Sequence, residues 1–252
     1  MSVAATSLFR DTGPRNNLLD ALREDDFALL QPSLSTRPAD RGDVLYEPGD
    51  AVRYVYFPCG RTLVSFLVLQ DEGHAVETAL VGREGAIGGV VSQGRLPAFA
   101  RVQVQYGGTL LRMEAAALED AKSRSKTLQN LFARYADCVM AQVFQAVACN
   151  ATHTIEQRAA KWLLAAIVRT GDHEVPLTQD QLARMLGVGR GYVSRVIRTF
   201  KEKDVLATRR GGLIVKDLDE LDRVSCRCND AVHRHFDDVL KGVYPEPTDD
   251  GA

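Results

Sequence analysis

The spacing of apolar residues changes along the chain, and the change separates two kinds of structure. From Asp40 to Met113, apolar residues lie in short runs rich in β-branched and aromatic side chains, separated by turn residues such as Pro48-Gly49-Asp50 and Gly107-Gly108. Runs of this kind at regular spacing predict an all-β sandwich, roll or barrel. The expected strands are 44–46, 52–57, 63–69, 76–81, 101–105 and 109–113.

After Met113 the apolar period becomes helical and predicts a short helix over 114–124 and a long one over 127–149. Along the long helix one seam repeats at spacings of four and three: Leu128, Phe132, Tyr135, Val139, Gln142, Ala146 and Cys149. A second stripe lies beside it: Met140, Val143, Phe144 and Val147. A helix that is apolar on two sides needs a packing partner on each of them. We expect the seam to meet the same helix of a second copy and the other side to pack on the β domain. A core helix within one subunit is the alternative.

These patterns predict an α+β chain with five segments. We expect a disordered tail at 1–17, a β domain with flanking helices at 18–124, a dimerisation helix at 125–150, a C-terminal domain at 151–240 and a second tail at 241–252. No apolar run approaches the ~18–20 residues of a membrane span. The first residues also lack the apolar core of a secretory signal. We therefore expect a cytoplasmic protein with no membrane partner.

The sharpest pattern runs from Leu177 to Phe200 and predicts a helix-turn-helix. Thr178 and Gln181 form a capping box at the start of the first helix, and Gly187 suits the positive φ of a sharp turn. In the second helix, Val193 and Ile197 belong to an inward face whose opposite side is basic. Two strand-like runs follow, 205–208 and 213–215, with a hairpin tip between them. The expected DNA-binding residues are Thr178, Gln179, Arg190, Gly191, Tyr192, Ser194, Arg195, Arg198, Arg209 and Arg210.

The distribution of charge supports a polyanion site at this position. The whole chain has a formal net charge of −2, but residues 184–216 hold nine basic residues against Glu202 and Asp204, a local charge of +7. One basic segment on an acidic body is typical of nucleic-acid binding. Motifs of enzymes, such as a P-loop, G-x-S-x-G or H-E-x-x-H, do not occur. We expect double-stranded DNA as the partner and no catalysis.

These motifs resemble the Crp/Fnr family of bacterial transcription regulators over nearly the whole chain. Besides the helix-turn-helix and wing, residues 42–50, Gly-Asp-Val-Leu-Tyr-Glu-Pro-Gly-Asp, are similar to the family's early β-roll signature. The resemblance implies a cyclic-nucleotide-binding-like antiparallel β-roll, a long dimerisation helix and a winged helix. It also implies a homodimer on a palindromic operator, with RNA polymerase as a further partner. Arg190, Arg195 and Ser194 would contact bases or phosphates. Gly191 replaces the family's polar base-reading residue, so the operator is expected to differ.

The resemblance places a small-molecule pocket at Gly85, Ala86, Ile87, Gly88, Ala98, Phe99 and Ala100. In members that bind cyclic AMP, this cassette has a Glu for the ribose and an Arg for the cyclic phosphate. Here Ala86 and Ala98 stand in those places, and a phosphate without a charged partner is costly to bury. We therefore expect no control by cyclic AMP, although Arg95 and Arg101 lie nearby. Another ligand, cyclic di-GMP included, and effector-free control both remain open.

The five cysteines are Cys59, Cys138, Cys149, Cys226 and Cys228. Their odd number and wide spacing argue against a disulfide framework. On one helix, Cys226 would share a face with His233, and Cys228 would share the opposite face with His235, because two residues span about 200°. One helix cannot close both pairs around one ion, so we expect no metal site and no cofactor.

Overall fold

The computed structural model describes residues 15–70, 75–91, 94, 96–241 and 243. Its N-terminal domain contains two antiparallel sheets that face each other, which confirms the expected β-roll. Val64, Ile87, Val102 and Leu110 belong to the core of the roll. One sheet has the order β1 (Ser35–Ala39), β7 (Gly108–Glu114), β3 (Tyr54–Cys59). The other has the order β2 (Val44–Tyr46), β6 (Arg101–Tyr106), β4 (Leu63–Leu69), β5 (Ala75–Val81).

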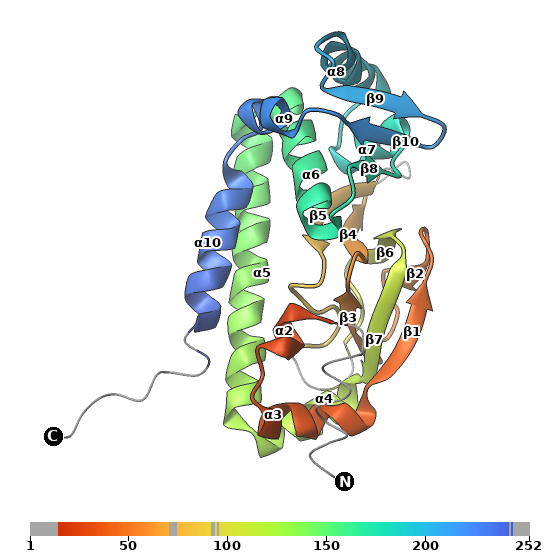
Figure 1. Cartoon of the computed structure of the whole chain (residues 1–252). Coiled ribbons are helices and arrows are strands. Elements are labelled where there is room, and N and C mark those ends of the chain that lie inside the picture. Colours follow the sequence, from red (N-terminus) through yellow and green to blue (C-terminus); the bar gives the residue numbers. More distant parts are fainter. Residues whose placement is uncertain (1–14, 71–74, 92–93, 95, 242, 244–252) are drawn as a thin grey trace, which may run out of the picture.

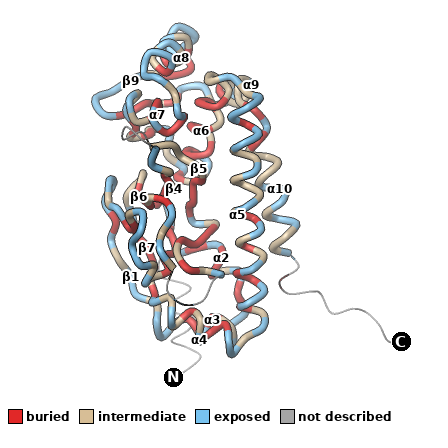
Figure 2. The backbone as a smooth tube through the Cα atoms, turned by 180° about the vertical axis from the view of Figure 1, so that it is seen from behind, coloured by how far each residue is buried: buried red, intermediate tan, exposed pale blue. Residues whose placement is uncertain are grey.

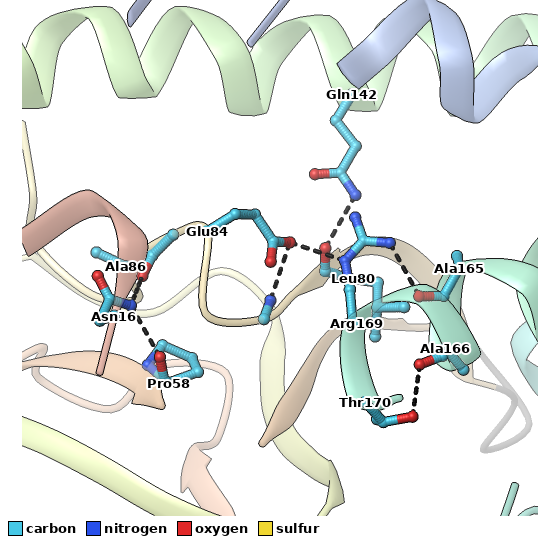
Figure 3. Close-up of polar contacts among 12 residues, drawn as sticks. Asn16, Pro58, Leu80, Glu84, Ala86, Gln142, Ala165, Ala166, Arg169 and Thr170 are labelled. Carbon is cyan, nitrogen blue, oxygen red and sulfur yellow. Dashed lines mark hydrogen bonds and ion pairs between the residues drawn. The ribbon is translucent and has the colours of Figure 1, made fainter. Parts of the chain in front are cut away.

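The N-terminal segment, expected to flank the β domain as helix, contains several short elements. It forms α2 (Asn17–Asp20), α3 (Glu24–Leu30) and the 3-10 turn η1 (Gln31–Ser33), and then the edge strand β1, whose polar sequence gave no strand signal. Asn16, expected in the disordered tail, is 1% exposed. Its side chain accepts from the backbone of α2 and donates to the carbonyls of Pro58 and Gly85 (Figure 3). Residues 1–14 and 244–252 of the expected tails lie outside the described residues.

Two helices lead from the roll to the C-terminal domain. The short helix α4 (Ala115–Arg124) precedes α5 (Lys126–Thr152), which runs along the length of the molecule, with α10 (Cys228–Lys241) at its side (Figure 1). Ser125 caps the start of α5 by accepting from the Leu128 backbone N–H. No helix of the described residues is both long and apolar enough to cross a membrane.

The two apolar stripes of α5 have exchanged their expected roles: the seam packs on the roll, and residues of the second stripe are exposed. Leu128, Phe132 and Tyr135 are at most 1% exposed because they pack on the roll within the same subunit. Val139 packs against the same core, Gln142 donates to the Leu80 carbonyl, and Ala146 is partly buried. The seam expected to bind a second copy is therefore an intramolecular contact. Met140, Phe144 and Val147, from the second stripe, are instead 49–65% exposed.

The C-terminal domain contains α6 (Ile155–Thr170), β8 (Glu174–Val175), α7 (Gln179–Met185), α8 (Arg190–Glu202), β9 (Leu206–Arg209), β10 (Gly212–Val215) and α9 (Leu218–Val224). The strands form an antiparallel sheet in the order β8-β10-β9, so the wing has a third strand that the sequence did not indicate. Trp162 and Leu163 of α6 lie in the core beneath α7 and α8. The expected winged helix-turn-helix is thus confirmed.

Several polar contacts join the two domains near the end of α6. Arg169 forms an ion pair with Glu84 of the roll, Nε to Oε1 2.8 Å, and Gln142 of α5 donates to Leu80 at 3.0 Å (Figure 3). Burial alone would raise the pKa of Glu84. The charge and hydrogen bond of Arg169, together with backbone N–H donors, lower it instead. The Trp162 indole N–H donates to Glu77 at 2.8 Å. The Arg169 and Trp162 contacts fix α6 against the roll, and the Gln142 contact fixes α5 against it.

Candidate functional site: a nucleic-acid interface and a ligand cavity

Local chemistry sets the geometry of the helix-turn-helix. The Thr178–Gln181 capping box starts α7, and Gly187 takes φ +66° after it, a conformation that costs glycine little. Arg158 of α6 donates to the Leu186 carbonyl at the end of α7, at 2.6 Å. Sequence reasoning missed Arg158, because an arginine on a helix gives no sign that it lies buried beneath a turn. The turn is therefore held from below by a third helix.

The recognition helix α8 has one buried and one exposed side. Val193, Ile197 and Phe200 are at most 1% exposed, as expected from their spacing. The opposite side lies on the outer surface of the domain (Figure 2) and carries the exposed residues Arg190, Gly191, Tyr192, Arg195 and Arg198. A helix that is apolar on the inside and basic on the outside can lie in the major groove of DNA.

Two contacts organise this exposed surface. The Arg195 guanidinium lies 4.7 Å from the centre of the Tyr192 ring, an arrangement that favours an extended arginine. The Ser194 hydroxyl donates to Gln179 of α7 at 3.0 Å. Two pairs of the expected DNA-binding residues are therefore in contact: Gln179 with Ser194, and Tyr192 with Arg195. Thr178 is exposed at the start of α7.

The wing places two further arginines on the surface. The β9–β10 hairpin pairs Arg209 with Gly212, and Gly211 in the tip takes φ +82°. Arg209 forms an ion pair with Glu174 of β8, whereas Arg210 is exposed at the tip. A hairpin of this kind can contact phosphates beside the groove that a recognition helix enters.

The expected effector residues do not all face the same space. Gly88, Ala98, Phe99 and Ala100 line a cavity of about 450 Å³ between the roll and α5. Val139 and Val143 of α5 form its other wall. No charged side chain of the described residues lines it. Arg101 points elsewhere and pairs with Glu47 at 2.9 Å, and Arg95 lies outside the described residues.

Gly85, Ala86 and Ile87 pack on protein rather than on this cavity. A Cβ at Gly85 would lie 2.3 Å from the hydroxyl oxygen of Tyr135, so glycine is required there for steric reasons. That hydroxyl donates to the Ala86 carbonyl at 2.9 Å. The Gly85 and Ile87 N–H groups donate to Gly82 and Tyr56, so neither is free for a phosphate.

Comparison with known proteins agrees with this geometry. Residues 157–224, which include α7, α8 and the wing, match the model of the Crp-like helix-turn-helix domain. This segment is therefore similar to Crp-like helix-turn-helix domains. No curated protein matches the chain in sequence.

Among solved structures with similar folds, several are named as transcriptional regulators. A protein assigned to the Crp/Fnr family of transcriptional regulators, from Eubacterium rectale ATCC 33656, aligns with TM-score 0.63 and 17% identity over 82% of this chain and 96% of its own. FixK2 from Bradyrhizobium japonicum aligns with TM-score 0.64 and 14% identity over 77% and 98%. The c-di-GMP-responsive global regulator CLP of Xanthomonas campestris aligns with TM-score 0.62 and 12% identity over 77% and 100%. The chain therefore combines a Crp-like DNA-binding domain with the fold of Crp/Fnr transcriptional regulators.

Proposed function

We propose that this Crp-like chain is a non-catalytic, sequence-specific transcriptional regulator that acts as a homodimer on a palindromic operator. The observation that carries the proposal is the exposed side of α8, where Arg190, Tyr192, Arg195 and Arg198 stand opposite a fully buried apolar side. Arg190 lies in the first turn, which is the part of a recognition helix that reaches base edges. Arg209 and Arg210 contact flanking phosphates, and RNA polymerase is the further partner.

The exposed stripe of α5 is the surface proposed for dimerisation. Met140, Phe144 and Val147 project from the helix away from both the roll and α10. The same stripe on a second copy would cover them around a twofold axis. Such an axis along α5 places two recognition helices on the same side of the dimer, as a palindrome requires.

The cavity bears on the choice of effector. Its lining is mainly apolar and holds no charged side chain among the described residues. This disfavours a cyclic phosphate, because a buried phosphate needs a charged donor or several aimed N–H groups. CLP, whose fold is similar, responds to cyclic di-GMP. Our proposal is that cyclic AMP does not control this chain. A ligand-responsive regulator that binds cyclic di-GMP is the alternative.

The test starts from duplexes selected out of a random pool by the wild-type protein. In gel shifts on the selected duplex, Arg195→Ala should weaken specific binding by about 1–3 kcal/mol, roughly 5- to 150-fold, as expected for a base contact. Arg209→Ala should weaken binding to selected and scrambled duplexes alike, and should lower the salt slope by about one. Arg124→Ala, an exposed arginine on α4, is the matched control and should bind like wild type.

Two results would contradict the proposal. One is a pool that yields no enriched palindrome. The other is that Arg195→Ala and Arg209→Ala both bind the selected duplex as tightly as the Arg124→Ala control does.

A further inference from the structure

Three cysteines and one histidine from distant parts of the sequence meet at the end of α5 beside α9. Cys149 lies near the end of α5 and His153 caps it, whereas Cys226 follows α9 and Cys228 begins α10 (Figure 1). Their ligand atoms, three sulfurs and one ring nitrogen, all lie within 4.8 Å of one another. The three cysteines are at most 7% exposed and form a separate buried cluster. This cluster takes no part in the DNA-binding or cavity surfaces.

The expectation of no metal site placed Cys226, Cys228, His233 and His235 on one helix, and the structure differs from it in two ways. Cys226 precedes α10, so the offset of about 200° between residues two apart on a helix does not apply to Cys226 and Cys228. Their partners are not His233 and His235, which are exposed, but residues of α5 that lie more than 70 positions earlier. Only the packing of α10 against α5 and of α9 against α6 brings the four together.

Two distances within the cluster match those around a tetrahedral zinc ion, and all of its ligand atoms lie within 4.8 Å of one another. With Zn–S of about 2.3 Å and Zn–N of about 2.0–2.1 Å, tetrahedral angles place two sulfurs about 3.8 Å apart, and sulfur and nitrogen about 3.6 Å apart. The Sγ atoms of Cys149 and Cys226 are 3.7 Å apart. Cys228 Sγ and His153 Nδ1 are 3.6 Å apart. The ligand atoms therefore need little movement to close on an ion.

Two neighbouring side chains donate to the sulfurs. Lys161 Nζ of α6 lies 3.4 Å from Cys149 Sγ, and Gln145 Nε2 lies 3.2 Å from Cys228 Sγ. N–H donors directed at sulfur stabilise thiolates and are typical of the outer shell of metal sites. Three thiolates, one neutral imidazole and Zn²⁺ sum to a single negative charge, which the Lys161 ammonium offsets.

We propose that Cys149, His153, Cys226 and Cys228 bind one Zn²⁺ ion in a closed structural site. Four protein ligands leave no open position for water or substrate, which distinguishes a structural from a catalytic zinc site. The ion holds the start of α10 against the end of α5, at the point where α5 connects to α6. Cys226 and Cys228 lie just beyond the segment matched by the Crp-like domain model.

Zinc content of the full-length protein gives the first test. Protein expressed with added zinc, purified under reducing conditions and freed of loose metal, should contain one zinc per chain by mass spectrometry. Cys228→Ser and His153→Ala should lose the ion. Cys138→Ser is the matched control, because Cys138 is also buried on α5 but lies outside the cluster, and it should keep full zinc.

Cobalt gives a second readout that does not depend on the folding of the variants. Wild-type protein stripped by a chelator and titrated with Co²⁺ should show thiolate-to-cobalt charge transfer and the visible bands of tetrahedral cobalt, saturating at one equivalent. Gln145→Ala should lower the cobalt affinity by roughly 10-fold, as expected for an outer-shell donor.

Several outcomes would overturn the proposal. They are wild-type protein without zinc and without tetrahedral cobalt bands, full zinc in Cys228→Ser, a Cys149–Cys226 disulfide in freshly purified protein, and iron with sulfide in protein purified without oxygen.

Discussion

Glu77 couples the roll to the DNA-binding domain through a single carboxyl group. It accepts hydrogen bonds from Ser65 of β4 and from the Trp162 indole N–H of α6. Burial raises the pKa of Glu77 from 4.5 to about 7, although both hydrogen bonds oppose the shift. Because the folded chain then holds a proton that the unfolded chain has released, the free energy of unfolding falls as the pH rises from about 4.5 to about 7.

Glu77→Gln should remove this loss of stability. The amide oxygen still accepts from Trp162, but the side chain no longer ionises. We expect the variant to match wild type near pH 4.5 and to be about 1–3 kcal/mol more stable above pH 7. Urea denaturation between about pH 5 and pH 8 measures the difference. A difference in stability between the variant and wild type that stays constant over this pH range would show that the pKa of Glu77 is not raised.

Glu84→Gln is the companion variant, and we expect it to change the stability at neutral pH in the opposite direction. The lowered pKa of Glu84 means that its ion pair with Arg169 stabilises the fold at neutral pH, and that this contribution is lost as the pH falls through the folded pKa. We expect the variant to be about 1–3 kcal/mol less stable than wild type near pH 7. The difference in stability between the variant and the wild type should become smaller at acidic pH. Equal stability at neutral pH would show that the ion pair contributes nothing.

At the scale of elements, α5 has three differently occupied faces. One packs on the roll through Phe132 and Tyr135, and another meets α10, where Arg134 donates to the Val239 carbonyl. The third carries Phe144 and Val147, both 65% exposed. Large apolar side chains grouped on one stripe are typical of an interaction surface. The two covered faces leave this stripe as the one available to a second copy.

Val147→Glu should therefore separate the proposed dimer. Placing two carboxylates across a twofold axis costs several kcal/mol, so the dimer dissociation constant should rise by at least roughly 100-fold. Val168→Glu on α6 is a matched control, because Val168 is 64% exposed but lies off the stripe. Sedimentation velocity reports the state of each variant. A wild-type monomer, or a Val147→Glu dimer as stable as the control, would contradict this assignment.

At the scale of the whole molecule, α5 links the cavity to the DNA-binding domain. Val139 and Val143 form a wall of the cavity, and α5 ends at Thr152, shortly before α6 begins at Ile155. A ligand that moved this wall would act on the helix that leads to α6. Packed elements thus connect the cavity to the helix-turn-helix domain.

Cyclic AMP should not occupy this cavity tightly. We expect a dissociation constant weaker than about 1 mM, ~4 kcal/mol of affinity. The reason is that the phosphate would lose its hydration among uncharged residues while the Gly85 and Ile87 N–H groups are already used. Isothermal titration with cyclic AMP, cyclic GMP and cyclic di-GMP as separate arms measures this. Micromolar binding of cyclic AMP would contradict the expectation, and tight binding of cyclic di-GMP alone would favour the alternative effector.

The sequence by itself determined the elements whose signal is local. The short β-branched and aromatic runs of the roll, the Thr178–Gln181 capping box, the turn at Gly187 and the two faces of α8 are each encoded within a few consecutive residues. Backbone and side-chain preferences act directly at that range. The expectations for these elements and the β-roll were confirmed for that reason. The edge strand β1 was missed because its polar residues lack an apolar period.

Only the tertiary structure decided which partners these elements meet. The seam of α5 could be covered by the roll or by a second copy with the same apolar pattern, and packing assigned Leu128 and Phe132 to the roll. Cys149 and Cys226 are 77 residues apart, and no local pattern records their contact. Burial energy depends on area removed from water and not on which surface removes it. An apolar or cysteine pattern therefore predicts that a residue is covered, whereas its partner is set by the assembled fold.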